Sequence, residues 1–191
     1  MSTYNPDTYC GIYCGSCSIM TAGRTGRRDR LASFWSPDRI RKFLTFQNVP
    51  HDDKDLTLEC SGCKSDHVFI NCRGCAIRKC AIEKRMAHCS DCGEFPCATY
   101  REWKNIQVML PHLKETDGNL DAIGKAGVTA WMAEQDKKWS CPGCGTAFSW
   151  YTETCGVCGR DLKGSAYRFS RLKSLVLKIG ISLGARKANN K

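Results

Sequence analysis

Cysteine spacing is the feature that most constrains this chain. Fifteen of its 191 residues are cysteine, and most of them fall in pairs separated by two residues. Two thiolates at that spacing can face one ion from a single tight turn, which suits a tetrahedral metal with Zn–S bonds of about 2.3 Å. We therefore predict a metal-binding protein with zinc as its main cofactor. The candidate ligands are Cys10, Cys14, Cys17, Cys60, Cys63, Cys72, Cys75, Cys80, Cys89, Cys92, Cys97, Cys141, Cys144, Cys155 and Cys158.

The last four cysteines form the clearest site. Cys141 and Cys144 make one knuckle, Cys155 and Cys158 make another, and a glycine follows the second cysteine of each. Glycine accepts a positive φ, so that backbone N–H groups can turn toward the sulfurs. The pattern predicts a separable zinc ribbon over residues 139–160. An iron-loaded, rubredoxin-like centre is the alternative, although rubredoxins separate their knuckles more widely.

Residues 60–97 hold eight cysteines, enough for two four-ligand sites. His67 and His88 lie beside them and can replace a thiolate, although we expect both side chains to be solvated. Both zinc and iron–sulfur clusters are bound by cysteines at this spacing, so the spacing does not identify the metal. An interleaved pairing fits the spacing as well as the simplest one does. The simplest pairing groups Cys60, Cys63, Cys72 and Cys75, and then Cys80, Cys89, Cys92 and Cys97.

The first three cysteines leave a metal one ligand short. The spacing of Cys10, Cys14 and Cys17 matches the cluster loop of radical S-adenosylmethionine enzymes, but those enzymes need most of a barrel, for which this chain has too little room. An iron–sulfur cluster at this triplet is one alternative function. We favour completion of the triplet by a downstream cysteine or histidine, in one compact domain from Cys10 to Cys97.

Cysteine usage and the polar start of the chain bear on the compartment. Residues 1–9 contain no apolar leader, and the number of cysteines is odd. We therefore expect reduced, metal-binding thiols in the cytoplasm, with a disulfide framework as the alternative.

Positive charge concentrates at the end of the chain. Residues 160–191 carry nine Lys or Arg against Asp161 alone, so this segment has a charge of +8 of the total +10. We expect weak contact of residues 163–191 with a polyanion, either nucleic acid or anionic lipid. The segment also carries an apolar stripe that we expect to pack on the body, and it is too short and charged for a transmembrane helix. The stripe consists of Leu172, Leu175, Val176, Ile179 and Leu183.

Four helices are predicted from local signals. Ser36 and Pro37 suit the start of one helix, and residues 76–84 lack Gly and Pro, which places Cys80 on a second. Apolar residues at helical spacing predict a third helix from about Ala98 to Pro111, and a fourth from Asn119 through Gly127 to Trp131.

Several cysteine motifs together resemble a known family. They are Tyr9–Cys17, Cys60–Cys63, Cys72–Arg78 and Cys89–Cys97, and the segment 123–140 with its ribbon is similar to longer members. The chain thus resembles, over residues 4–160, a cysteine-rich family of unknown function from bacteria and archaea. The resemblance implies metal binding and no known activity.

The resulting fold prediction is a small metal-stabilised α+β protein. Its predicted segments are a cysteine-rich helical and knuckle domain (1–98), a helical connector (99–138), the zinc ribbon (139–160) and a basic amphipathic tail (161–191). The isolated carboxylates Glu83, Glu94 and Glu102 offer no catalytic pair, and no phosphate loop or nucleophile–histidine motif is present. The sequence therefore favours a non-enzymatic interaction module for a macromolecule. An iron–sulfur redox protein and a nucleic-acid-binding zinc-ribbon protein are the alternatives.

Overall fold

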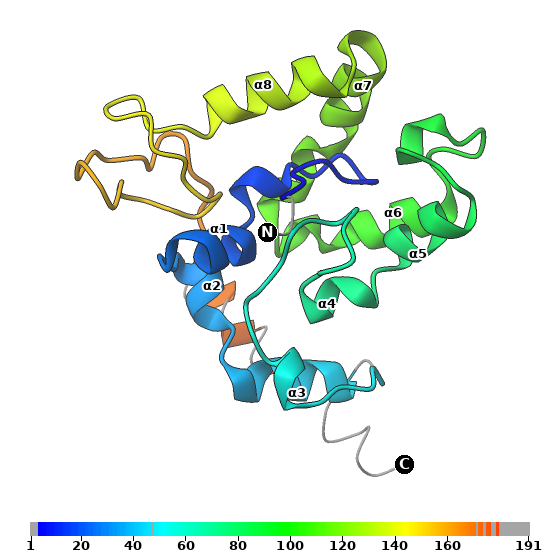
Figure 1. The fold of residues 1–191 in the computed structure, drawn as a ribbon, viewed down its shortest axis with the longest axis horizontal. Helices are drawn as coiled ribbons and strands as arrows, with labels where there is room; N and C mark the ends of the chain where they lie inside the picture. Colours follow the sequence, from blue (N-terminus) through cyan, green and yellow to red (C-terminus); the bar gives the residue numbers. More distant parts are fainter. Residues whose placement is uncertain (1–3, 47, 171, 174, 177–178, 180–191) are drawn as a thin grey trace.

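The computed structural model describes residues 4–46, 48–170, 172–173, 175–176 and 179, and these are mostly helical (Figure 1). The α-helices are α1 (Ser18–Thr25), α2 (Arg30–Phe34), α3 (Pro37–Phe46), α4 (Ile70–Arg73), α5 (Ala76–Glu83), α6 (Ala98–Lys104), α7 (Thr116–Ala126) and α8 (Val128–Lys138). Short 3₁₀ turns lie at Cys14–Ser16, Asp53–Asp55, Cys89–Asp91, Asn105–Val108 and Pro111–Glu115. Within the described part, β pairing amounts to two isolated bridges. The described part of the chain is therefore mostly helical with almost no strand.

Helix α3 confirms the prediction made from its capping residues. The backbone N–H of Arg39 donates to Ser36 Oγ at 3.4 Å, and Pro37 is the first helical residue. Ile40 and Leu44 lie one turn apart and are fully buried. The helix predicted around Cys80 is also present, as α5.

The predicted helix from Ala98 to Pro111 ends earlier than expected. Regular α-helix stops at Lys104, and a 3₁₀ turn follows over Asn105–Val108. Leu110 then has φ −116° and ψ 84°, outside the helical region, because the ring of Pro111 disfavours helical geometry in the residue before it. The second half of the predicted helix is thus a pair of tight turns.

Gly127 divides the other predicted helix into α7 and α8. Its φ is 81° and its ψ is 158°, a conformation that residues with a side chain rarely adopt. Its N–H closes α7 on the carbonyl of Ile123 at 2.9 Å, and its carbonyl accepts from Trp131 at the start of α8. The apolar spacing persists through the glycine, but the backbone turns there.

Buried apolar residues form three clusters. The largest joins Tyr13 and Leu31 to α7, α8 and the residues around the last four cysteines. A second lies between α1, α2, α3 and the segment 56–70, and a third joins Cys10 to Ile77, Tyr100 and Leu120. In Figure 1 the end of α8 leads into the loops that hold the last four cysteines, and these loops lie beside α1 and α2.

The prediction that the tail stripe packs on the body is wrong for the residues described. Leu172 is 70% exposed, and Leu175, Val176 and Ile179 are each about half exposed. Phe169, only 1% exposed, is the last described residue in the main cluster, and the described residues of the stripe lie outside that cluster. Leu183 and several tail cations lie outside the described residues. No helix among the residues searched is long and apolar enough to cross a membrane.

Candidate metal centre

Four cysteine sulfurs near the end of the chain converge on one point. The sulfurs of Cys141, Cys144, Cys155 and Cys158 all lie within 4.8 Å of one another. The Cys141–Cys158 and Cys144–Cys155 sulfurs are each 3.6 Å apart. Tetrahedral Zn–S bonds of about 2.3 Å place sulfurs about 3.8 Å apart. A disulfide needs about 2.0 Å, so these distances fit ligands of one ion rather than cross-links.

The two knuckles that carry these cysteines have the same backbone geometry. In each, the N–H of the first cysteine, Cys141 or Cys155, donates to the carbonyl five residues later at 2.9 Å. The N–H of Gly145 returns to the Cys141 carbonyl at 2.8 Å, and that of Gly159 returns to the Cys155 carbonyl at 3.0 Å. These glycines have φ of 70° and 73°, as their place after each knuckle predicted. The site therefore combines two copies of one local turn.

Local hydrogen bonds change the acidity of the four thiols. The hydroxyl and the backbone N–H of Thr146 lower the pKa of the Cys144 thiol to about 6. Backbone N–H groups of the second knuckle lower the pKa of Cys155. The N–H of Arg160 lowers the pKa of Cys158, but the neighbouring thiols raise it overall to about 11. Thiolates are the form that binds metal, and this site favours a thiolate at neutral pH.

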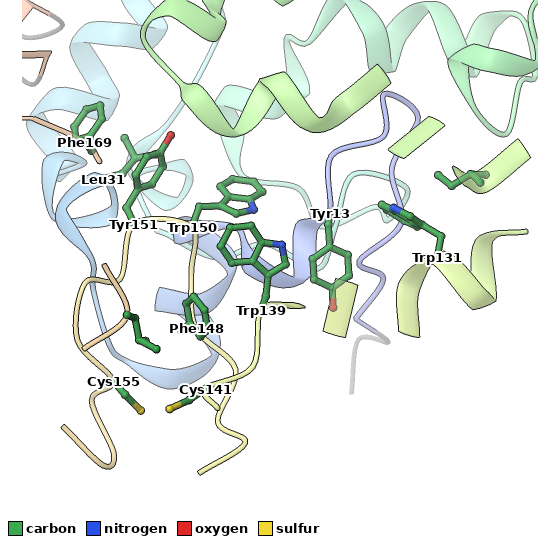
Figure 2. Packing of buried hydrophobic residues seen from close by; sticks show 12 residues of the cluster. Tyr13, Leu31, Trp131, Trp139, Cys141, Phe148, Trp150, Tyr151, Cys155 and Phe169 are labelled. Carbon is green, nitrogen blue, oxygen red and sulfur yellow. The ribbon is translucent and has the colours of Figure 1, made fainter. Parts of the chain in front are cut away.

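An aromatic cluster holds the two knuckles against the rest of the chain (Figure 2). The sulfurs of Cys141 and Cys155 point toward each other at its edge, and Trp139, Phe148 and Trp150 lie behind them. The N–H of Trp150 also donates to the Ser16 carbonyl at 3.0 Å. The aromatic residues of the ribbon are therefore buried against the N-terminal segment and α8 as well as against one another, while separate folding of the ribbon stays a prediction.

The N-terminal cysteines lie beside the thiols of residues 60–72. Cys14 begins a 3₁₀ turn, and Cys17 directly precedes α1. Burial raises the pKa of Cys14 well above its usual value, and the nearby thiols of Cys17, Cys63, Cys60 and Cys72 raise it further. Cys14 and Cys17 thus lie next to downstream cysteines, while metal sharing between them stays a prediction.

Cys10 belongs to a neighbouring group of thiols. Burial raises the pKa of Cys10, and Cys63 and Cys75 add to the shift. Its sulfur also lies 3.7 Å from Thr8 Oγ1. Cys10 also belongs to the third apolar cluster, where it packs with Ile77 and Tyr100.

The four cysteines between residues 80 and 97 surround a small cavity. Cys80, Cys89, Cys92 and Cys97 all line it, and its volume is about 30 Å³. Burial raises the pKa of Cys89 to about 12, with Cys97 and Cys80 as the next largest causes. Lys84 Nζ lies 3.9 Å from the Cys92 sulfur. Among the described residues, the last four cysteines are the group whose ligand atoms lie close enough together to hold one metal ion.

Comparison with protein families places the cysteine-rich region. Residues 7–102 match the model of DUF3795, described as a protein of unknown function, and this span is just over half of the 191 residues. The chain belongs to DUF3795. No curated protein and no solved structure matches it. The DUF3795 match ends before α7, so residues 103–160, which the sequence resemblance included, lie outside it.

The start of the DUF3795 domain is held by backbone contacts to its cysteine motifs. Asn5 N–H donates to the Ser61 carbonyl at 2.9 Å, and Cys89 N–H donates to the Tyr9 carbonyl at 2.7 Å. Gly62 has φ of 117°, and a Cβ there would lie 2.0 Å from the Asn5 carbonyl oxygen. The glycine in Cys60–Cys63 is therefore needed for the close approach of the N-terminal segment.

His88 is not solvated, contrary to the sequence prediction. It is 7% exposed, and its Nε2 lies 2.9 Å from Asp7 Oδ1. Lys64 Nζ pairs with Asp7 Oδ2 at 2.5 Å and lies 3.2 Å from His88 Nε2. Buried polar groups need such partners, and here they hold the N-terminus against the middle of the DUF3795 domain. His67 is exposed as predicted, 3.4 Å from Glu59.

A second buried histidine, His112, was not predicted from the sequence. Its ring stacks on Trp150 with a centroid distance of 3.8 Å, and its Nδ1 lies 2.7 Å from Tyr151 Oη. Burial lowers the pKa of His112 to about 3, so the ring is neutral. Nothing near His112 in the sequence marks it, because both partners lie about 40 residues away.

Proposed function

We propose that the chain is a zinc-stabilised interaction module of the DUF3795 family. Cys141, Cys144, Cys155 and Cys158 bind one Zn²⁺ in a zinc ribbon, and the metal supports the surface formed by the ribbon, α1 and α2. The observation that carries this proposal is the 3.6 Å spacing of the paired sulfurs, which is close to the edge of a zinc–sulfur tetrahedron.

Four cysteine ligands favour a structural role for this zinc. A catalytic zinc keeps one position for water or substrate, whereas an all-cysteine set closes the coordination shell. The bound ion would also displace protons from several neighbouring thiols, and its positive charge would offset the repulsion between the resulting thiolates. An iron-loaded centre with the same ligands is the alternative, and the metal's identity separates the two.

The eleven cysteines of residues 10–97 bind further metal in this proposal. Eleven is not a multiple of four, so at least one site uses a ligand other than a protein thiolate or leaves a cysteine uncoordinated. Cys14, Cys17, Cys60 and Cys72 suit one site because each lies near the others. The second set comprises Cys80, Cys89, Cys92 and Cys97.

An iron–sulfur cluster is the second candidate for the DUF3795 domain. Four cysteines line the 30 Å³ cavity, and four cysteine thiolates are the usual ligands of an iron–sulfur cluster. This candidate would add electron transfer to the function, while the ribbon would remain a zinc site.

Elemental analysis and zinc-edge X-ray absorption of protein prepared without oxygen test the proposal. We expect zinc to be present, with a shell of four sulfurs at about 2.3 Å. Brown colour and acid-labile sulfide in the same sample would assign clusters to the DUF3795 domain. Zinc-free protein with its last four cysteines in disulfides would contradict the ribbon site.

A further inference from the structure

A basic cleft lies between the start of the chain and the ribbon. It has a volume of about 490 Å³, and one wall is the junction of α1 and α2 while the other is the ribbon from Thr146 to Gly156. Figure 1 shows these two segments side by side. Three arginines, Arg27, Arg28 and Arg30, line the first wall.

Two of these guanidinium groups are free to bind a ligand. Arg27 and Arg28 are exposed, and their side chains make no hydrogen bond or ion pair with another described residue. Arg27 lies across the second knuckle, since a Cβ at Gly156 would meet its Cδ at 3.2 Å. Arg30 uses one nitrogen, which donates to the Phe169 carbonyl at 3.2 Å.

The acidic residues of the cleft offset this charge only in part. Asp29 accepts from the Ala32 N–H and from the hydroxyls of Ser18 and Ser149, so its carboxylate is engaged inside the protein. Glu153 is the other carboxylate on the lining. Thr21 and Thr154, one on each wall, make no side-chain hydrogen bond with another described residue, so their hydroxyls add neutral hydrogen-bond donors.

The side chains that line this cleft are suited to binding phosphate groups. A guanidinium group is planar, permanently charged and able to donate two parallel hydrogen bonds to phosphate oxygens, and hydroxyls complete such contacts. The aromatic residues of the cleft, Phe148 and Tyr151, are 4% and 3% exposed, so neither offers a face on which a base can stack. A nucleic acid would therefore be bound through its sugar–phosphate backbone and not through its bases.

The basic tail leaves the body beside this cleft. Arg30 binds the carbonyl of Phe169, and the sequence from Ser170 onward holds six Lys or Arg and no Asp or Glu. A cationic cleft followed by a cationic segment suits a linear polyanion that makes several phosphate contacts in series.

We propose that the cleft between Arg27, Arg28 and the ribbon binds the phosphate backbone of a nucleic acid without sequence preference. The proposal rests on the proposed function, because the zinc site fixes the ribbon wall. It names the partner of the interaction module and places the contact in the folded body.

The test is binding of the full chain to fluorescent 20-nucleotide strands, poly-dT, poly-rU and a mixed sequence, over a range of salt concentrations. The cleft variant is Arg27→Gln with Arg28→Gln. The charge-matched control is Arg41→Gln with Arg101→Gln, since both residues are exposed and lie outside the cleft lining. Zinc content is measured in every sample, so that loss of binding is separated from loss of the ribbon.

We expect similar binding of all three strands and affinity that falls steeply with salt. The cleft variant should bind roughly tenfold or more weakly, and its slope of log affinity against log salt should decrease by about 1.4, or about 0.7 for each phosphate that the variant no longer neutralises. The control should bind like the wild type. If the wild-type protein contains no zinc, the proposed function is contradicted, but the affinities of the cleft variant and its control can still be compared.

Equal affinity of the cleft variant and its control would overturn the proposal. Absence of strand binding at physiological salt, together with binding to vesicles containing anionic phosphatidylglycerol, would overturn it in favour of a lipid surface.

Discussion

The ribbon cysteines and the DUF3795 cysteines differ in how the chain brings them together. In the ribbon, two short knuckles with matching hydrogen bonds place four sulfurs within 4.8 Å. In the DUF3795 domain, contacts between distant segments bring the thiols near one another, as where the Cys89 N–H donates to the Tyr9 carbonyl. Two local turns thus bring four potential metal ligands together near the end of the chain, whereas the DUF3795 thiols depend on the fold around them.

This comparison predicts its largest effect at the ribbon. Cys144→Ser should remove the ribbon zinc, because it takes away one of the four thiolate ligands. Structural zinc contributes roughly 10–16 kcal/mol to folding in small zinc-finger peptides, so the ribbon should then unfold locally. Hydrogen exchange should then show reduced protection over residues 139–162, with protection retained around α3. Cys97→Ser, in the DUF3795 domain, is the control and should leave ribbon protection intact. Full zinc content and native protection in Cys144→Ser would refute the assignment.

The second prediction concerns the long-range contacts of the DUF3795 domain. Gly62→Ala should destabilise the domain by roughly 2–3 kcal/mol, because the new Cβ would collide with the Asn5 carbonyl oxygen at a φ that disfavours side chains. Gly93→Ala is the control, since no atom lies within 4 Å of its Cβ position. Urea unfolding measures both. Equal stability of the two variants would mean that the N-terminal contact is dispensable.

The third prediction is a pH dependence carried by His112. Its folded pKa of about 3 lies below the unfolded value of about 6.5, so its stabilising effect is complete above pH 6.5 and declines as the pH falls toward 3. Between pH 7.5 and 5.5 the wild type should lose about 1.4 kcal/mol more than His112→Gln. Urea midpoints at both pH values, measured with excess zinc, would show this. Parallel losses in both proteins would exclude the histidine as the cause.

The fourth prediction tests the similarity of the two knuckles. Gly145→Ala and Gly159→Ala should each cost about 1–2 kcal/mol, since both positions have positive φ and open space around the Cβ position. Gly124→Ala, inside α7, should instead stabilise the chain by up to about 1 kcal/mol. Thermal unfolding compares the three. Clearly unequal costs at Gly145 and Gly159 would show that the knuckles are not equivalent.

Local signals in the sequence predicted the elements that local geometry builds. Ser36 and Pro37 identified α3, and the Cys-x-x-Cys pairs with their glycines identified the site at Cys141–Cys158. Both depend on hydrogen bonds within a few residues, which spacing alone encodes.

Features that depend on distant contacts were not predictable in this way. His88 is buried by Asp7, 81 residues away, and the ribbon aromatics pack on Tyr13 and Leu31. The break at Gly127 was missed because apolar spacing reports which face is buried and not where the backbone turns. The exposed tail stripe was missed because periodicity does not show that Phe169 already closes the core.

Native mass spectrometry of the intact chain tests the central claim most directly. Each bound zinc replaces protons and adds a defined mass, while iron–sulfur clusters and disulfides give different masses. The account predicts that Cys144→Ser loses the mass of one zinc ion relative to the wild type and keeps the metal of the DUF3795 domain. An unchanged number of zinc ions in Cys144→Ser would contradict a zinc site at Cys141, Cys144, Cys155 and Cys158.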